Sequence, residues 1–244
     1  MIDLHSHILP GIDDGAKDMR QSLDMLRVAI FDGIKTIVAT PHVLGRMDSE
    51  LNNKIVTAHK QLVQAAKDEG LQIEIRLGAE IYMSPEWESA IEYPCCTFEG
   101  KGKYMLMEFA MNEVPYAYDT ILRQIVDRGI VPIIAHPERN YQINRRMELA
   151  QYIIDTGAVL QINSGSVIGK FGRRVKKVAF AMMRNDMVYI VASDAHNPRS
   201  RPPMLSPACE LIIKNFDEEY AENLTIYNPE FILETNKNNS KLDN

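Results

Sequence analysis

The sequence predicts an α/β protein built as one closed parallel barrel, and three observations support this fold class. Seven short apolar runs alternate with helical patterns along 244 residues, a length typical of a single α/β barrel. The runs are nearly continuous in aliphatic residues, as expected for parallel strands that are covered on both faces. Metal-competent side chains follow six of the runs, and parallel barrel strands end on one shared face. We therefore expect a single domain over residues 1–234.

The strands and helices follow from these patterns in chain order. The predicted strands are the runs MIDLHSH, TIVATPH, IEIRLGAE, YMLMEF, VPIIAHPER, AVLQINS and VYIVASDAH. Between them, apolar residues recur at helical spacing at Leu51, Ile55, Ala58 and Leu62, at Tyr118, Ile121, Leu122 and Ile125, and at Met147, Ala150, Ile153 and Ile154. Most helical patterns end on a glycine that can adopt positive φ: Gly33, Gly70, Gly129 and Gly157.

Two segments depart from this alternation. Residues 82–103 contain two prolines, Trp87 and two cysteines, which predicts an irregular excursion with a short helix near Trp87. Residues 235–244 are polar and have no apolar period, which predicts a disordered tail.

Composition excludes several classes of function. The net charge of -6 argues against nucleic-acid binding, which depends on clustered basic residues. Cys95, Cys96 and Cys209 form no C-x-x-C pair and no even framework, which favours a reduced, cytoplasmic protein over a secreted disulfide scaffold. Met1 leads directly into a strand, and no apolar stretch reaches the roughly 18 residues that a membrane span needs. We expect a soluble protein without membrane insertion.

Five of the six histidines and three acidic residues lie at strand exits, and a further acidic residue lies in the first loop. Together they form a set of nine candidate metal ligands: His5, His7, Asp14, His42, Glu80, Glu108, His136, Asp194 and His196. Imidazole and carboxylate groups suit divalent ions such as Mn, Fe or Zn. Nine ligands exceed one coordination sphere and suit two or three ions. Clustered ions can generate hydroxide and neutralise a phosphoryl group during in-line attack.

Simpler explanations exist for some of these residues. Glu80 and Glu108 could instead be salt-bridge partners at strand ends, and Asp14 could belong to a plain turn. His59 lies inside the helical pattern of residues 49–69, where we expect a solvated side chain. A single histidine at a strand end is also more often a satisfied polar residue than a ligand, but five at equivalent positions predict a metal site.

Polar residues on the same rim predict a phosphorylated substrate. Arg139, Arg199 and Arg201 follow the last histidines closely, and a guanidinium can bind two phosphate oxygens at once. Asn163 and Ser164, at the exit of the sixth run, could add hydrogen bonds. The sequence contains no Walker-type loop, no G-x-S-x-G elbow and no C-x5-R signature, so phosphate chemistry here would be metal chemistry.

The segments DLHSH, TPH, GAE, MEF, AHPER and SDAH, in this order, resemble the motifs of the polymerase and histidinol phosphatase (PHP) superfamily over residues 1–203. Within it, HILPGIDDGA, HPERN and SDAHN with the following RPP resemble the manganese-dependent protein-tyrosine phosphatases of bacterial capsule and exopolysaccharide loci. The resemblance implies a distorted, TIM-like (β/α)7 barrel with a trinuclear Mn²⁺ centre. It also implies that the enzyme removes phosphate from the tyrosine-rich tail of a cognate bacterial tyrosine kinase that controls polysaccharide export.

The resemblance further implies how the ligands divide. His5, His7, Glu80 and Asp194 would hold one ion, Glu80, Glu108 and His136 a second, and Asp14, His42 and His196 a third. Arg139 and Arg201 match catalytic, phosphate-binding arginines, and Arg199 is close enough in sequence to compete for the second role.

Two other functions stay open. One is a small-molecule phosphatase of the histidinol-phosphate type, and the other is a non-catalytic, metal-binding PHP-like domain that binds a kinase or polymerase. The intact ligand set argues against the second. The bound ions could also be Fe, Zn, Co or Mg, and the sequence leaves open whether the chain forms a homo-oligomer.

Overall fold

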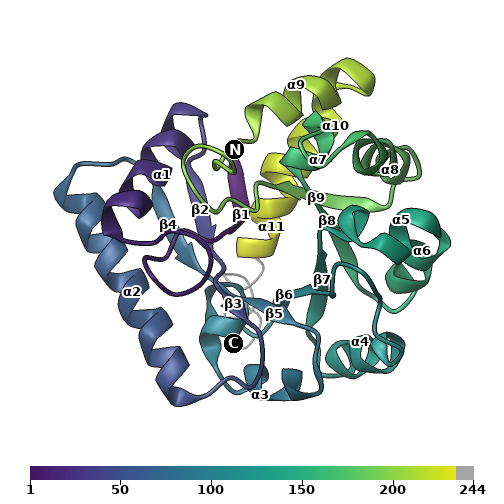
Figure 1. The fold of residues 1–244 in the computed structure, drawn as a ribbon, viewed down its shortest axis with the longest axis horizontal. Coiled ribbons are helices and arrows are strands. Elements are labelled where there is room, and N and C mark those ends of the chain that lie inside the picture. Colours follow the sequence, from purple (N-terminus) through teal and green to yellow (C-terminus); the bar gives the residue numbers. More distant parts are fainter. Residues whose placement is uncertain (235–244) are drawn as a thin grey trace, which may run out of the picture.

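The computed structural model describes residues 1–234, and its strands run parallel in two hydrogen-bonded sheets (Figure 1). The strands are β1 (Ile2–Ser6), β2 (Thr36–Ala39), β3 (His42–Val43), β4 (Glu74–Leu77), β5 (Glu80–Tyr82), β6 (Tyr104–Glu108), β7 (Val131–Ala135), β8 (Val159–Asn163) and β9 (Val188–Ala192). One sheet has the order β1-β2-β4, and the other has the order β3-β5-β6-β7-β8-β9. The predicted α/β class with parallel strands is confirmed.

Two of the seven predicted runs are each divided into two strands. The second run forms β2 and, after an interruption at residues 40–41, β3. The third run forms β4 and, after an interruption at residues 78–79, β5. β3 and β5 pair with each other in the larger sheet, with His42 opposite Glu80 in the parallel register. The interruptions therefore place two predicted ligands side by side.

The two sheets meet where β1 approaches β9. Ser6 forms a parallel bridge with Ala195. The His7 N–H donates to the Ala195 carbonyl at 2.8 Å, and the Asp194 N–H donates to the His5 carbonyl at 2.9 Å. These bonds confirm that the first and last strands are neighbours at their carboxyl ends.

Phe98 lies at the other junction of the sheets, between β4 and β6. It belongs to the predicted excursion, which is confirmed as irregular and contains η1 (Pro85–Trp87), α3 (Glu88–Ile91), η2 (Pro94–Cys96) and η3 (Phe98–Gly100). η3 contacts both strands, and the Phe98 ring is buried. A Cβ on Gly78 would lie 2.8 Å from this ring, so a glycine is needed for the close approach. The excursion thus fills the gap between β4 and β6.

Helices surround the strands (Figure 1). They are α1 (Met19–Phe31), α2 (Ser49–Asp68), α4 (Tyr118–Asp127), α5 (Tyr141–Arg145), α6 (Glu148–Ile154), α7 (Ser164–Ile168), α8 (Arg173–Arg184), α9 (Ser206–Asn215), α10 (Glu218–Glu222), a π-helical segment (Asn223–Tyr227) and α11 (Asn228–Glu234). The predicted stripes of α2, α4 and α6 are either buried in the core or partly buried and packed against it. The four predicted glycines all have positive φ, as helix ends require.

α11 lies across the middle of the strand arrangement in Figure 1. Its Ile232 and Leu233 are buried with Leu4 of β1 and Val38 of β2 in one apolar cluster. The last described helix therefore belongs to the core on which the strands carrying the site are packed.

His59 corrects one prediction, because it is not a freely solvated side chain. It is partly buried on α2, and its Nε2 lies 3.0 Å from the carbonyl oxygen of Ile75 on β4. Burial lowers the pKa of His59, so a neutral ring donates this hydrogen bond. The predicted disordered tail lies outside the described residues. Within residues 1–234, no helix has both the length and the apolar character needed to cross a membrane.

Candidate metal centre

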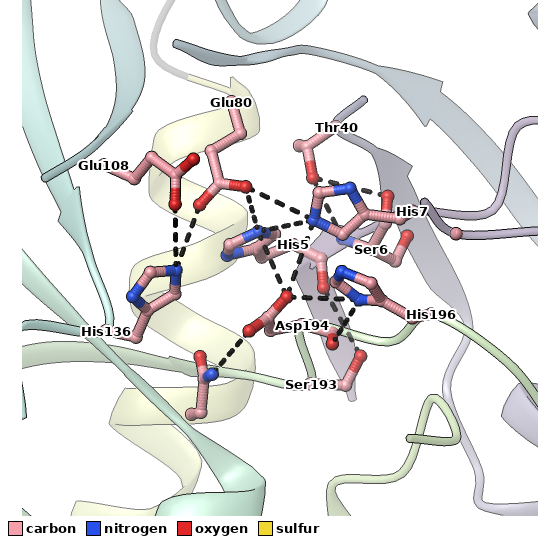
Figure 2. A network of polar contacts seen from close by, with 12 residues as sticks. His5, Ser6, His7, Thr40, Glu80, Glu108, His136, Ser193, Asp194 and His196 are labelled. Carbon is pink, nitrogen blue, oxygen red and sulfur yellow. Dashed lines mark hydrogen bonds and ion pairs between the residues drawn. The ribbon is translucent and has the colours of Figure 1, made fainter. Parts of the chain in front are cut away.

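The nine predicted ligands converge around the carboxyl ends of β1, β2, β4, β6, β7 and β9. Figure 2 labels His5, His7, Glu80, Glu108, His136, Asp194 and His196. They lie at the following positions: His5 on β1, His7 just after it, Asp14 in the next loop, His42 at the start of β3, Glu80 at the start of β5, Glu108 at the end of β6, His136 after β7, and Asp194 and His196 after β9. Most of these side chains are buried or nearly so, whereas the Asp14 side chain is 66% exposed. The site is therefore a buried cluster with one open side.

Two imidazoles from β1 face each other at the centre. The Nε2 atoms of His5 and His7 are 3.2 Å apart. Each Nδ1 has another partner: that of His5 lies 2.8 Å from Oε1 of Gln161, and that of His7 lies 2.8 Å from Oδ2 of Asp13. Since a neutral imidazole carries one N–H, these oxygens fix the protons on Nδ1 and leave both Nε2 lone pairs free for a cation.

Glu80 is the hub of the cluster. Its Oε2 lies 3.2 Å from Nε2 of His5, 3.3 Å from Nε2 of His7 and 3.1 Å from Nδ1 of His42, while its Oε1 lies 3.2 Å from Nε2 of His136. Among the described residues, Glu80 Oε2 and His42 Nδ1 are buried atoms without a hydrogen bond. Buried polar atoms without partners are costly, and a cation between them would satisfy both. The donor set therefore fits a metal ion.

A second group occupies the open side. Oδ1 of Asp14 lies 3.4 Å from Nε2 of His42 and 3.4 Å from Nε2 of His196. Together with His7, these residues can offer ligand atoms that all lie within 4.8 Å of one another. This group is more accessible to solvent than the rest of the cluster because Asp14 comes from a loop and not from a strand.

Glu108 and His136 complete the cluster next to Glu80. His136 Nε2 lies 3.7 Å from Oε2 of Glu108, and His42 Nδ1 lies 3.3 Å from Oε1 of Glu108.

The groups whose ligand atoms lie within 4.8 Å of one another are His7, Asp14, His42 and His196; His5, His7 and Glu80; and His42, Glu80 and Glu108. They overlap with the implied sets but include neither Asp194 nor His136, so the division of the ligands stays a prediction. His7, His42 and Glu80 each belong to two of these groups. A neutral imidazole has one free lone pair and can bind only one ion, whereas the two oxygens of the Glu80 carboxylate could bind neighbouring ions.

Asp194 connects the cluster to the predicted phosphate-binding arginines. Its Oδ1 faces the imidazoles, 3.7 Å from Nε2 of His5. Its Oδ2 accepts hydrogen bonds from Arg139 at 2.8 Å and Asn163 at 2.6 Å, and it is 2.6 Å from the Nη2 of Arg201. Two guanidinium groups therefore lie directly beside the predicted ligands. The Arg201 Nε is buried and has no hydrogen-bond partner within residues 1–234, so it remains an available donor.

Two other predicted substrate contacts are not in this cluster. The Ser164 hydroxyl donates to the Met204 carbonyl at 2.7 Å. Arg199 is exposed and lines a separate pocket. Both residues are close to the ligands in sequence, but neither lies in the cluster. A substrate role for them stays a prediction.

Two predicted ligands have a strained backbone. His136 and Asp194 have φ values of 36° and 52°, in the left-handed region that residues other than glycine rarely occupy. His136 also precedes Pro137, which disfavours helical conformations of the residue before it. Such conformations cost about 1–3 kcal/mol each and persist where the surroundings enforce them, commonly at functional sites. They turn both side chains inward at strand ends.

The electrostatics of the cluster couple its imidazoles to its carboxylates. Burial alone would lower the pKa of His7, but hydrogen bonds to Asp13, Asp194 and Glu80 raise the pKa by more than burial lowers it. The pKa of His7 therefore lies well above its ordinary value. Burial and the neighbouring His7 lower the pKa of His196 to about 4. Without an ion, protons on some imidazoles balance the buried carboxylates, and bound cations would replace these protons.

The sequence reasoning missed the residues that orient the ligands. Asp13 holds the His7 ring and also accepts the His42 N–H at 3.0 Å. Burial raises the pKa of Asp13, but the hydrogen bond from His7 lowers it to about 2, so it is an anion. Gln161 holds His5 from β8. Its signal was present, because Gln161 is a polar residue in an apolar run, two positions before Asn163 and on the same face.

Glu138 is another missed residue. It is fully buried, and its Oε1 accepts the Asn163 N–H at 2.9 Å and the Ser166 hydroxyl at 2.5 Å. These bonds tie the short helix η4 (Pro137–Arg139) to the end of β8, which positions the adjacent Arg139.

The donor chemistry is nitrogen and oxygen alone. Cys95 and Cys96 lie in the excursion and Cys209 lies on α9, outside these groups. Imidazole with carboxylate suits Mn, Fe, Zn or Co, and the mixture is typical of catalytic sites that keep a position open.

Comparison with known proteins agrees with this geometry. Residues 1–234 match the family described as "Capsular polysaccharide synthesis, CpsB/CapC". The chain is 34% identical over 233 residues to tyrosine-protein phosphatase YwqE of Bacillus subtilis, covering 96% of this chain and 91% of that protein. It is 34% identical over 238 residues to tyrosine-protein phosphatase CpsB of Streptococcus pneumoniae, covering 96% and 98%.

Solved structures give the same result. A chain from the study of YwqE from Bacillus subtilis and CpsB from Streptococcus pneumoniae, described as unique metal-dependent tyrosine phosphatases, aligns with a TM-score of 0.88 at 33% identity over 96% of this chain and 94% of that one. Histidinol phosphate phosphatase from Lactococcus lactis aligns with a TM-score of 0.55 at 14% identity over 87% and 93%, which shows a likeness of fold alone. The resemblance read from the motifs is confirmed, and this chain belongs to the CpsB/CapC family of capsular polysaccharide synthesis.

Proposed function

We propose that this protein is a metal-dependent phosphotyrosine-protein phosphatase. The proposal rests on one observation: Arg139 and Arg201 both form ion pairs with Oδ2 of Asp194, while Oδ1 of the same carboxylate faces the clustered imidazoles. This arrangement offers phosphate-binding donors directly beside a multinuclear metal site. Family membership supports the same reaction, since the relatives YwqE and CpsB are named tyrosine-protein phosphatases.

The centre would hold two or three divalent ions, with Mn²⁺ as the proposed ion and Fe, Zn, Co or Mg as alternatives. We assign the ligands to three sets: His5, His7, Glu80 and Asp194; Glu80, Glu108 and His136; and Asp14, His42 and His196. When bound, such ions lower the pKa of a water molecule and neutralise charge on a phosphoryl group. Asp13 and Gln161 keep the Nε2 atoms of His7 and His5 turned toward the ions.

The arginines orient the phosphate. Each guanidinium has five N–H groups in a rigid fork, and Asp194 occupies only part of each fork. The remaining donors, among them Nε of Arg201, can bind non-bridging phosphate oxygens as charge shifts onto them. Asp194 holds both forks in place before substrate arrives, so little reorganisation is needed.

An aryl phosphate suits this site better than an alkyl phosphate. The phenol of tyrosine has a pKa of about 10, so its phenolate leaves with little help from an acid. Since the centre opens to solvent at Asp14, a tyrosine on a flexible segment of another protein can approach it. We propose as substrate the phosphotyrosine tail of a bacterial tyrosine kinase in the cytoplasm, in regulation of capsular and exopolysaccharide synthesis.

We also propose that the two sheets form one distorted seven-stranded barrel. The bonds between β1 and β9 support closure on one side, and the packing of η3 between β4 and β6 supports it on the other.

Substrate profiling after metal analysis tests the function. The purified protein is loaded with Mn²⁺, its metal content is measured, and kcat/KM is compared for a phosphotyrosine peptide, the same peptide with phosphoserine, and histidinol phosphate. We expect the phosphotyrosine peptide to be turned over far better than the other two. Preference for histidinol phosphate would favour the small-molecule phosphatase, and a fully loaded protein without turnover would favour a non-catalytic domain.

A further inference from the structure

We propose that a pocket beside the metal centre, lined by Lys17, Arg20 and Arg199, is a second anion-binding subsite. It would receive an acidic or phosphorylated side chain that flanks the phosphotyrosine in the same peptide. This subsite presupposes the proposed phosphatase activity and adds a determinant of substrate choice to it. The pocket has a volume of about 660 Å³, and its lining residues come from the start of α1 and from the loop after β9.

The charges that line the pocket favour an anion. Lys17, Arg20 and Arg199 are exposed, and none of their side chains forms an ion pair or a hydrogen bond with any residue in 1–234. Three positive charges without an ion-pair partner within residues 1–234 line this pocket, and they outnumber its two carboxylates on a protein whose net charge is -6. Cations that line a concave surface attract an anionic ligand more strongly than isolated surface charges do.

The two carboxylates of the pocket are already engaged. Asp18 caps α1, and its Oδ1 accepts the Gln21 N–H at 2.8 Å. Asp24 Oδ1 accepts a hydrogen bond from Arg27 at 2.6 Å. Neither carboxylate contacts the three cations, so the positive charge remains available to a ligand.

One wall of the pocket is a rigid extension of the phosphate site. Asn197 Oδ1 accepts the backbone N–H groups of Arg199 at 3.1 Å, Ser200 at 2.7 Å and Arg201 at 3.3 Å. This turn directs Arg201 to Asp194, while Arg199 lines the pocket. A single ordered turn therefore presents one arginine to each site.

The other wall is anchored to a predicted metal ligand. The Ala16 N–H donates to the His7 carbonyl at 3.0 Å, and a Cβ on Gly15 would lie 2.1 Å from that carbonyl oxygen. The loop is thus packed against the backbone of His7, and Lys17 and Arg20 follow it directly. Since both walls continue from loops of the metal centre, the pocket is held at a fixed position relative to a bound phosphate.

A peptide can reach both sites at once. The open side of the centre is formed by Asp14, in the same loop that leads to Lys17. Extended chain advances about 3.3 Å per residue, so a flank of a few residues suffices to cross from one arginine of the Asn197 turn to the other. The acidic side chain or second phosphate would thus belong to a residue near the phosphotyrosine.

Three peptides that differ at one flanking position test the subsite. The position carries Gln, Glu or a second phosphotyrosine, and kcat/KM is measured on the full-length, Mn²⁺-loaded protein at low salt. We expect about a tenfold preference for the anionic peptides, the effect of one favourable charge contact. Preference for phosphotyrosine over Glu would identify phosphate as the better ligand, and equal preference would mean that charge alone is recognised.

Charge-matched variants assign the preference to the pocket. K17Q/R20Q should reduce the preference to near unity, whereas K60Q/K67Q, which removes two exposed charges from α2, should keep it. The preference should also weaken as salt is raised. Circular dichroism and thermal melting of each variant show that it is folded.

Different results overturn the subsite and the proposed function. Equal kcat/KM for the three peptides, with good turnover of the Gln peptide, would remove the subsite and leave the phosphatase intact. If no peptide is hydrolysed, the phosphatase proposal fails, and fluorescence anisotropy with peptides carrying non-hydrolysable phosphonate analogues still tests the pocket. Equal affinities for the three peptides would overturn the subsite. An equal loss of affinity for the anionic peptides in K17Q/R20Q and K60Q/K67Q would overturn it as well.

Discussion

The Nε2 atoms of His5 and His7 face each other across 3.2 Å at the centre of the site. Two unshared lone pairs at this distance repel each other, so either a proton or a cation must lie between them. The carboxylates of Glu80 and Asp194 surround the same space. Protons and metal ions therefore compete for one place, which links metal binding to pH.

Metal affinity should fall as the pH falls. Burial alone would lower the pKa values of His5, His7 and His42, but nearby carboxylates raise these pKa values by more than burial lowers them. All three pKa values therefore lie above the ordinary value in the ion-free protein. Below these raised values, the imidazoles carry protons that an ion must displace, and affinity weakens by about tenfold per pH unit for each proton released.

Titration calorimetry with Mn²⁺ between about pH 6 and about pH 8, in buffers of different ionisation enthalpy, counts these protons. Chelation should also lower the melting temperature, because ions bound only by the folded chain stabilise it. A dissociation constant that does not change with pH would contradict this account.

Replacing Asp13 by Asn should weaken metal binding without removing a ligand. Oδ2 of Asp13 accepts hydrogen bonds from the His7 ring and the His42 N–H, and Oδ1 accepts the Gly15 N–H. An amide is neutral and has only one accepting oxygen, so it cannot keep all three bonds. Loss of such an orienting partner costs about 10–100-fold in metal affinity. Mn²⁺ affinity is compared with that of D68N, an exposed acid at the end of α2. Wild-type affinity in D13N would show that Asp13 does not position His7.

Glu80→Gln should abolish turnover at saturating substrate. The substitution keeps the shape of the side chain but removes the charge that faces four imidazoles. We expect a lower metal content and a loss of about 10²-fold or more in kcat, as for other catalytic contacts. Metal analysis and steady-state kinetics check both effects, with E50Q on α2 as the control. A metal-loaded variant with more than about a tenth of wild-type kcat would refute the bridging role.

Arg139→Ala and Arg201→Ala should bind metal normally but lose about 10²-fold in kcat/KM on a phosphotyrosine peptide, since each removes donors to the phosphate. Arg139→Lys should recover only part of this loss, because an ammonium lacks the bidentate fork and the stacking on Phe171, whose ring centre lies 4.2 Å from the guanidinium carbon. Metal content and kcat/KM are measured together. Wild-type kinetics in both alanine variants would mean that these arginines do not bind the phosphate.

The strands and the candidate ligands can be predicted from the amino-acid pattern alone. Six of the seven apolar runs end on a metal-competent side chain, and parallel strands bring their ends to one rim. Local periodicity and one rule of topology are therefore enough to predict that His5 and Glu80, which are 75 positions apart, lie on the same rim. The helix ends at the four glycines were equally local.

The details that depend on strand register and on turns arise from the packing of the folded chain. The interruptions that separate β3 from β2 and β5 from β4 set His42 opposite Glu80. Loop hydrogen bonds decide that Asp13 and not Asp14 contacts the His7 ring. They also decide that Arg199 and Arg201 point in different directions. Such hydrogen bonds join residues that follow no regular spacing along the chain, so no sequence pattern predicts them. They form only when the packed strands hold the loops in place.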